Sequence, residues 1–189
     1  QLGNTLAEIA VNKAGIIKTG CPVISNVPDA GCSQMHSIVA QGVCMGSRLF
    51  DVSGIRAAVS EQTPFSQVVS MELYEKSYSD VEISMVGKHQ AENLKTALAT
   101  LEILRKSGAV KLDREALYEG LKRARQPGRF EVIGGGPEAG DESKPLVIID
   151  GAHNEAGAQA LQETMAQYFC RKKRSCSWQG SWQINKSIQ

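Results

Sequence analysis

The sequence predicts a mixed α/β fold, because short apolar runs alternate with stretches of helical periodicity. Two features carry most of this prediction. Leucines and alanines recur along one stripe over residues 90–106, which is typical of an amphipathic helix. An apolar strand at 145–149 runs into the turn Asp-Gly-Ala-His-Asn and then into an Ala-rich helix. Ligand groups collect at the carboxyl ends of buried strands in α/β proteins, so Asp150, His153 and Asn154 mark a candidate site.

The first third of the chain predicts a helix, a strand and a second helix. Residues 5–13 form a helix in which Thr5 caps the start and Glu8 takes the capping-box position. The apolar run 22–27 predicts a short buried strand, and 35–45 predicts a helix that ends at Gly46.

The middle of the chain changes period. Residues 66–86 alternate apolar and polar side chains, which predicts antiparallel strands. Helical spacing returns over 90–106 and stops at Gly108, and a further helix is expected over 113–123.

A Pro-Gly break places a domain boundary near Pro127, with one domain over 1–127 and the start of a second over 128–170. The glycine-rich stretch 134–144 is a hairpin loop or a linker. The tail 171–189 lacks the apolar run that should follow an α/β helix. Back-translating it with permitted codons and shifting the frame can restore a strand, so we hypothesise a frameshift there.

Bulk composition excludes several classes of protein. Of the 189 residues, 42% are hydrophobic, which is enough for one large domain or two small domains, each with a hydrophobic core. With 21 Lys and Arg against 20 Asp and Glu, the near-neutral charge gives no sign of a nucleic-acid partner. No run approaches the roughly 20 apolar residues of a membrane span, and no signal peptide is visible, so the expected location is cytoplasmic.

The five cysteines are odd in number and show no CxxC spacing, which argues against a disulfide framework or a zinc site. Reduced, mostly structural thiols are expected at Cys21, Cys32, Cys44, Cys170 and Cys176, and a reactive thiol is the alternative, although none has an evident basic, helix-start setting.

Five motifs in order resemble those of the folylpolyglutamate synthases, which belong with the Mur ligases: Leu2-Gly-Asn-Thr-Leu, Ile9-Ala-Val-Asn-Lys-Ala-Gly-Ile-Ile-Lys, Gly87-Lys-His-Gln with Asn93, Pro127-Gly-Arg-Phe-Glu, and Asp150-Gly-Ala-His-Asn. The resemblance covers about residues 2–170. It implies part of the Mur-ligase central domain followed by the start of a Rossmann-like C-terminal domain. It also implies ATP-dependent ligation of L-glutamate to the γ-carboxylate of a folate through an acyl phosphate, with ATP and Mg²⁺ as cofactors, in a monomer.

The side chain of Lys13 has two possible roles. Its place at a helix end fits a lysine that extends its ammonium into solvent. The resemblance implies instead that Lys13 is carbamylated, which turns a cation into an anion able to hold Mg²⁺ near the transferred phosphate.

His89 and Gln90 open the Ala-rich helix, and Asn93 lies one turn further on, where a ligand could meet side chains and free backbone N–H groups. An ordinary helix cap is the alternative. By resemblance Asn93 contacts the nucleotide, while the role of His89 stays open.

Arg129 follows a Pro-Gly turn, where a guanidinium can grip phosphate or ribose oxygens. The resemblance implies that Arg129 and Asp150 bind ATP and that His153, as a catalytic residue, lies near the phosphates. Asp150 could instead cap the next helix. Two positions depart from the family pattern: Glu155 stands where Pro is usual, and Asn12 where Glu is common.

The sequence contains no GxxxxGK[ST] phosphate loop. We therefore expect a fragment of the ligase, lacking the phosphate-loop part and most of the C-terminal domain, and inactive alone. Three alternatives stay open: a dihydrofolate synthase or bifunctional enzyme, a cell-wall Mur ligase, which the motif wording fits less well, and a non-catalytic remnant that binds nothing tightly.

Overall fold

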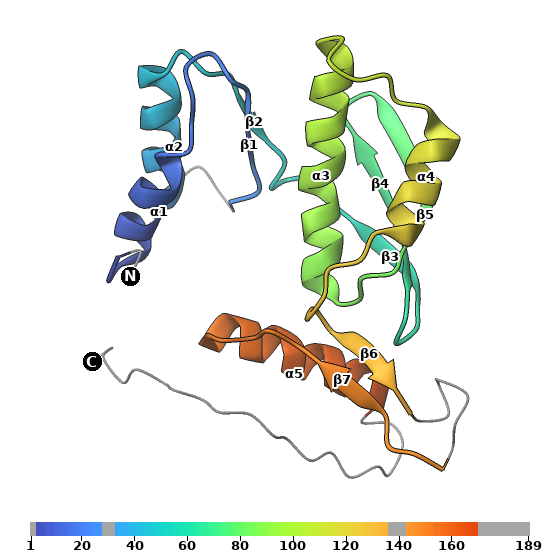
Figure 1. Ribbon diagram of the computed structural model, residues 1–189. Coiled ribbons are helices and arrows are strands. Elements are labelled where there is room, and N and C mark those ends of the chain that lie inside the picture. The colour runs from blue at the N-terminus through green and yellow to red at the C-terminus, as the bar shows by residue number, and fades with distance from the viewer. Residues whose placement is uncertain (1–2, 28–32, 136–142, 170–189) are drawn as a thin grey trace. The chain divides into compact units, whose positions relative to one another are not determined.

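A computed structural model describes residues 3–27, 33–135 and 143–169 (Figure 1). The chain forms two compact units. The first holds the described residues up to Ala58 together with Met71–Tyr78 and Glu92–Arg114, and the second holds Val59–Ser70, Ser79–Ala91 and the described residues from Glu115 onward. The expected tail at 171–189, with its proposed frameshift, lies outside the described residues.

The first unit opens with two helices and two short parallel strands. Helix α1 (Leu6–Ala14) begins as predicted, since Thr5 Oγ1 accepts a hydrogen bond from Glu8 N at 3.2 Å. The Glu8 carboxylate reaches back to Asn4 N at 2.6 Å, one residue before the cap. Strand β1 (Val23–Ser25) pairs in parallel with β2 (Leu49–Asp51), and α2 (Ser33–Cys44) connects them.

A three-stranded sheet in the order β3-β4-β5 follows. Its strands are β3 (Ala58–Gln62), β4 (Gln67–Leu73) and β5 (Lys76–Ile83). Only two residues join β4 to β5, so these neighbours run antiparallel, as the alternation predicts. The buried face of β4 carries Val69, Met71 and Leu73, as expected, and also the wholly buried Gln67.

Helix α3 (Lys88–Lys106) is attached to the sheet through one buried carboxylate. Glu102 is 2% exposed, and its Oε1 accepts hydrogen bonds from Lys76 Nζ at 2.7 Å and Tyr78 Oη at 2.6 Å. Its Oε2 accepts from Arg105 Nε at 2.9 Å. Three donors thus surround the carboxylate. The helix ends at Lys106, and Gly108 follows it with a φ of 77°, which suits glycine.

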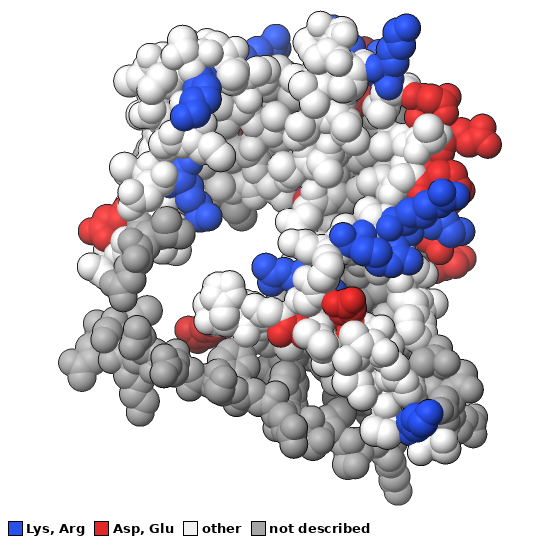
Figure 2. Space-filling model, in the orientation of Figure 1, with Lys and Arg blue, Asp and Glu red and all other residues white. Residues whose placement is uncertain are grey.

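Helix α4 (Arg114–Arg123) packs beside β5 in the second unit. Tyr118 Oη donates to Ser79 O at 3.1 Å, and Lys122 pairs with Glu82 at 2.6 Å. Basic and acidic side chains therefore lie next to each other. The face drawn in Figure 2 shows no large patch of either positive or negative side chains.

The second unit ends in a hairpin covered by a helix. Strands β6 (Glu131–Gly134) and β7 (Val147–Ile149) are antiparallel, so the stretch 134–144 connects a hairpin, although 136–142 lie outside the described residues. Helix α5 (Glu155–Phe169) contributes Leu161 and Phe169 to a core shared with Val86 and Phe130. The expectation that β7 is buried is only half right. Val147 and Ile149 are 42% and 47% exposed, because only one face of this short strand packs on the core through Ile148.

Among the described cysteines, Cys21 and Cys44 are free thiols, and both are exposed. Cys32, Cys170 and Cys176 lie outside the described residues.

Candidate functional site

Two turns at the start and end of the β6–β7 hairpin are joined by backbone hydrogen bonds. Gly151 N donates to Gly128 O at 2.7 Å. The Asp150 carboxylate accepts from both sides, with Oδ2 receiving Phe130 N and Oδ1 receiving Ala152 N, each at 2.8 Å. The side chain of Asp150 therefore fixes the Pro-Gly-Arg turn against the Asp-Gly-Ala-His-Asn turn, and it does so without capping α5.

Arg129 lies in the first of these two turns, and its side chain is exposed. Its backbone N–H donates to Gln126 O at 3.2 Å, and the preceding Gly128 has a φ of 71°. The next residue, Phe130, has an unusual φ of 45° while its ring is buried in the core. Because the backbone on both sides is fixed, the exposed guanidinium of Arg129 starts from a defined point.

His153 and Asn154 take different parts in the second turn. Asn154 Oδ1 accepts from Gly157 N at 2.8 Å, so Asn154 is the residue that caps α5. His153 Nδ1 lies 2.9 Å from Gly151 O. A carbonyl can only accept, so Nδ1 carries the proton and the exposed Nε2 is left to meet a ligand.

His89 faces the same pair of turns. It is half-buried, and this desolvation lowers the pKa of its imidazole, while the Asp150 carboxylate raises that pKa and the Arg129 guanidinium lowers it. The structure thus brings His89, Arg129 and Asp150 within electrostatic reach of one another.

Gly87 makes room for the imidazole of His89. An ideal Cβ at Gly87 would lie 2.8 Å from Thr164 Oγ1 and 3.0 Å from His89 Cε1, and the φ of Gly87 is 102°. A side chain there would therefore clash with both Thr164 and the imidazole of His89.

Lys13 and Asn93 belong to the first unit. Lys13 is exposed in the last turn of α1, where a cation is favoured by the helix dipole. Asn93 is exposed on the second turn of α3. The structure defines where these two side chains lie within their own unit, and their joint action with Arg129 and Asp150 stays a prediction.

Two polar residues that support this region, Gln67 and Glu131, were not predicted from the sequence. Gln67 Nε2 donates to Met85 O at 2.9 Å and Gly87 O at 3.1 Å, which supports the segment leading to His89. Glu131 Oε2 accepts from Gly128 N at 2.8 Å. Gln67 stands among apolar residues on the buried face of β4, and this misplaced amide is the signal that could have revealed it.

Comparison with known proteins decides the family. A dihydrofolate synthase/folylpolyglutamate synthase of Bacillus subtilis is 34% identical over 181 residues, which cover 92% of this chain. The folylpolyglutamate synthase of Lacticaseibacillus casei is 32% identical over 170 residues, covering 89% of the chain. The chain belongs to the folylpolyglutamate synthase family.

Solved folylpolyglutamate synthase structures share the fold, which confirms the expected α/β architecture of the Mur-ligase type. A complex with AMPPCP superposes with a TM-score of 0.74 at 30% identity, over 89% of this chain and 40% of that one. The Mycobacterium tuberculosis folylpolyglutamate synthase complexed with ADP gives a TM-score of 0.67 at 30% identity, over 89% and 36%.

The chain spans 38% of the length of the Bacillus relative and 37% of the Lacticaseibacillus one. None of the protein-family models matches it. Among the described residues, no helix is both long enough and apolar enough to cross a bilayer.

Proposed function

We propose that this chain is part of an ATP-dependent ligase that joins L-glutamate to the γ-carboxylate of tetrahydrofolate or its polyglutamates. The carboxylate would attack the γ-phosphorus of ATP with release of ADP, and the amine of glutamate would then displace phosphate from the acyl phosphate. The observation that carries the proposal is the joined pair of turns that presents Arg129 beside Asp150 and His153, in a chain whose structural relatives include complexes with AMPPCP and with AMPPCP and folate.

Arg129 and His153 are proposed to bind the nucleotide directly. The guanidinium of Arg129 offers a planar set of donors for phosphate or ribose oxygens. His153 Nε2 is the ring nitrogen that does not contact Gly151 O, and it would meet the nucleotide.

Asp150 is proposed to accept hydrogen bonds from the ribose hydroxyls as well as from the backbone. Each carboxylate oxygen has two lone pairs, and the structure uses one on each oxygen for Phe130 N and Ala152 N. The remaining pairs are available to the sugar, so the structural and the nucleotide-binding roles of Asp150 are compatible.

Lys13 is proposed to be carbamylated and to help hold Mg²⁺. Within the described ranges, no three His, Cys, Asp or Glu side chains gather as they would around a metal ion. One carbamate still fits, because Mg²⁺ is commonly held by one or two protein carboxylates together with substrate phosphates and water. The amine of Lys13 is exposed and accessible to carbon dioxide. Bound Mg²⁺ would neutralise negative charge on the phosphates.

The domain limits are part of the same proposal. Residues 1–127 would form the latter part of the central ATPase domain and 128–170 the start of the C-terminal ligase domain. The Pro-Gly turn at Pro127 supports this division, since it follows α4, which ends at Arg123, and begins the paired turns that hold Asp150.

A second candidate function is dihydrofolate synthesis, alone or in a bifunctional enzyme. The name of the Bacillus subtilis relative includes both activities. The two reactions share the ATP chemistry and differ in the acceptor, dihydropteroate or a folate.

The test is an acceptor assay with the protein that carries this sequence, supplied with ATP, labelled glutamate and either tetrahydrofolate or dihydropteroate. Label entering the folate supports the main proposal, and label entering dihydropteroate supports the second. A non-catalytic remnant predicts neither product and no nucleotide binding.

A further inference from the structure

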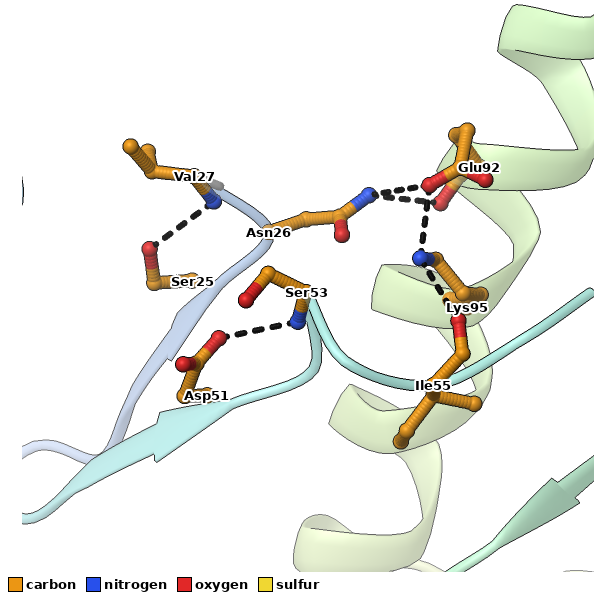
Figure 3. Close-up of polar contacts among 8 residues, drawn as sticks. All are labelled: Ser25, Asn26, Val27, Asp51, Ser53, Ile55, Glu92 and Lys95. Carbon is orange, nitrogen blue, oxygen red and sulfur yellow. Dashed lines mark hydrogen bonds and ion pairs between the residues drawn. The ribbon is translucent and has the colours of Figure 1, made fainter. Parts of the chain in front are cut away.

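A buried lysine joins the first turns of α3 to the segment that follows the second of the two parallel strands (Figure 3). Lys95 is 2% exposed, and its Nζ lies 2.9 Å from Ile55 O and 2.6 Å from Glu92 Oε2. Ile55 follows β2, so the ammonium connects the helix to the segment that leaves this strand.

Asn26 makes the matching connection from β1. It lies directly after this strand, and its Nδ2 donates to both Glu92 O and Glu92 Oε2, each at 3.2 Å. Figure 3 shows the Asn26 amide and the Lys95 ammonium approaching Glu92 from two sides. Glu92 is thus tied to β1 through Asn26 and to the segment after β2 through Lys95.

The strand ends themselves are closed by local hydrogen bonds. Ser25 Oγ accepts from Val27 N at 3.3 Å, and Asp51 Oδ1 accepts from Ser53 N at 2.8 Å. Val52 N donates to Ser25 O at 2.8 Å, so the two exit segments are also joined to each other. The helix turn is therefore attached to a preformed edge of the sheet.

Asn93 lies between Glu92 and Lys95 in the sequence, on the same turn of α3. A buried ammonium is costly unless it is paired, so this turn cannot shift without breaking the contacts of Lys95. We propose that Asn26, Glu92 and Lys95 are positioning residues, which hold Asn93 at the carboxyl edge of the β1–β2 sheet for contact with the nucleotide. The inference rests on the proposed function, in which Asn93 binds ATP.

The test compares variants of the full chain in two measurements. One is the NMR order parameters of the Asn93 backbone and side-chain amides, and the other is the affinity for ATP. Asn26→Ala removes the contacts from β1 without altering the helix, and Glu92→Ala removes the centre of the network. Both are expected to loosen the Asn93 amides and to weaken ATP binding about tenfold, a change typical of losing one such contact. Glu92→Gln can still accept from Asn26 and Lys95 but loses the charge that pairs with the buried ammonium, so its loss of ATP affinity is expected to be smaller than that of Glu92→Ala.

Glu119→Ala is the matched control, because Glu119 forms an exposed ion pair with Arg123 within α4. It is expected to change neither readout. If Asn26→Ala and Glu92→Ala leave the Asn93 amides as ordered as Glu119→Ala does, the positioning role is wrong. If the Asn93 amides loosen but the parent chain binds no ATP, positioning stands and the proposed function fails.

Discussion

The imidazole of His89 is within electrostatic reach of two opposite charges, those of Asp150 and Arg129. Desolvation lowers its pKa, Asp150 raises it and Arg129 lowers it. The neutral form is therefore favoured in the folded protein more than in an unfolded chain, and the two site charges tune this preference from opposite directions. The pKa of His89 thus depends on both Asp150 and Arg129.

Replacing the two charges should shift the pKa of His89 in opposite directions. Asp150→Asn removes a carboxylate and is expected to lower it, whereas Arg129→Gln removes a cation and is expected to raise it. NMR titration of the His89 ring protons measures both shifts. Shifts in the same direction, or none, would show that the imidazole does not sense these groups.

Arg129 also supports a prediction about geometry. Arg129→Lys keeps the charge but loses the planar set of donors, so ATP binding is expected to weaken by about 1–2 kcal/mol, or roughly tenfold, as for a lost charge-assisted hydrogen bond. Calorimetric titration checks this, with Arg123→Lys as a control because Arg123 lies on the exposed face of α4. Equal affinities for the two variants would remove Arg129 from the nucleotide site.

At this scale the sequence predicted the positions of the candidate residues better than it predicted the contacts that support them. The residue types and turn positions of Arg129, Asp150 and His153 can be read directly from the motifs. The supporting contacts cannot, because Gln67 and Glu131 act through backbone groups that are distant in the sequence or form only in the folded turn. Asp150 shows the same limit, since its two backbone partners flank it from separate segments.

At the scale of elements, the contact between α3 and the sheet depends on the charge of Glu102. Burial alone would raise the pKa of this carboxyl, but hydrogen bonds from Lys76, Tyr78 and Arg105 outweigh burial and bring it to about 2, below the ordinary 4.5. Its stabilising contribution is therefore complete above about pH 4.5 and is lost as the pH falls toward 2.

Glu102→Gln should destabilise the protein by about 1.5–3 kcal/mol near pH 7, the cost of losing charged hydrogen bonds. The difference between variant and parent should shrink as the pH falls from 4.5 toward 2, because the parent becomes protonated. Urea unfolding at several pH values measures this. A difference that does not depend on pH would contradict the assigned cause.

The approach of α5 to the start of α3 depends on Gly87. Gly87→Ala combines a strained φ of 102° with a clash against Thr164 Oγ1, so a loss of about 2–4 kcal/mol is expected. Gly20→Ala is the control, since Gly20 has a φ of 71° and no other atom within 4 Å of its ideal Cβ, and should cost only about 1–2 kcal/mol. Thermal unfolding compares the two, and equal losses would show that Gly87 matters only for its backbone.

The longer elements were predictable, whereas the strands β2 and β3 were not. The stripe over 90–106 and the alternation over 66–86 extend over enough residues for a period to show, and α3, β4 and β5 confirm them. Strand β2 has only three residues, and β3 exposes four of its five. Neither strand therefore shows a clear alternation of buried and exposed side chains. Both strands form because neighbouring strands complete their hydrogen bonding, which is information outside the local sequence.

For the whole molecule, composition correctly indicated a chain with enough apolar residues for real cores, and the motifs indicated the family that the comparisons establish. The arrangement into two units could not be predicted, because each unit draws on three separated segments and both share the sheet and α3. The predicted boundary at Pro127 follows local turn chemistry, which carries no information about such interleaving.

The most direct test of the account is an NMR titration of the chain with ATP, following the backbone amides. We predict saturable shifts at Arg129 and across 150–154, with further shifts at Asn93, and their loss in Arg129→Gln. Absence of shifts, or shifts confined to residues outside these turns and α3, would contradict the claim that the two joined turns form a nucleotide site.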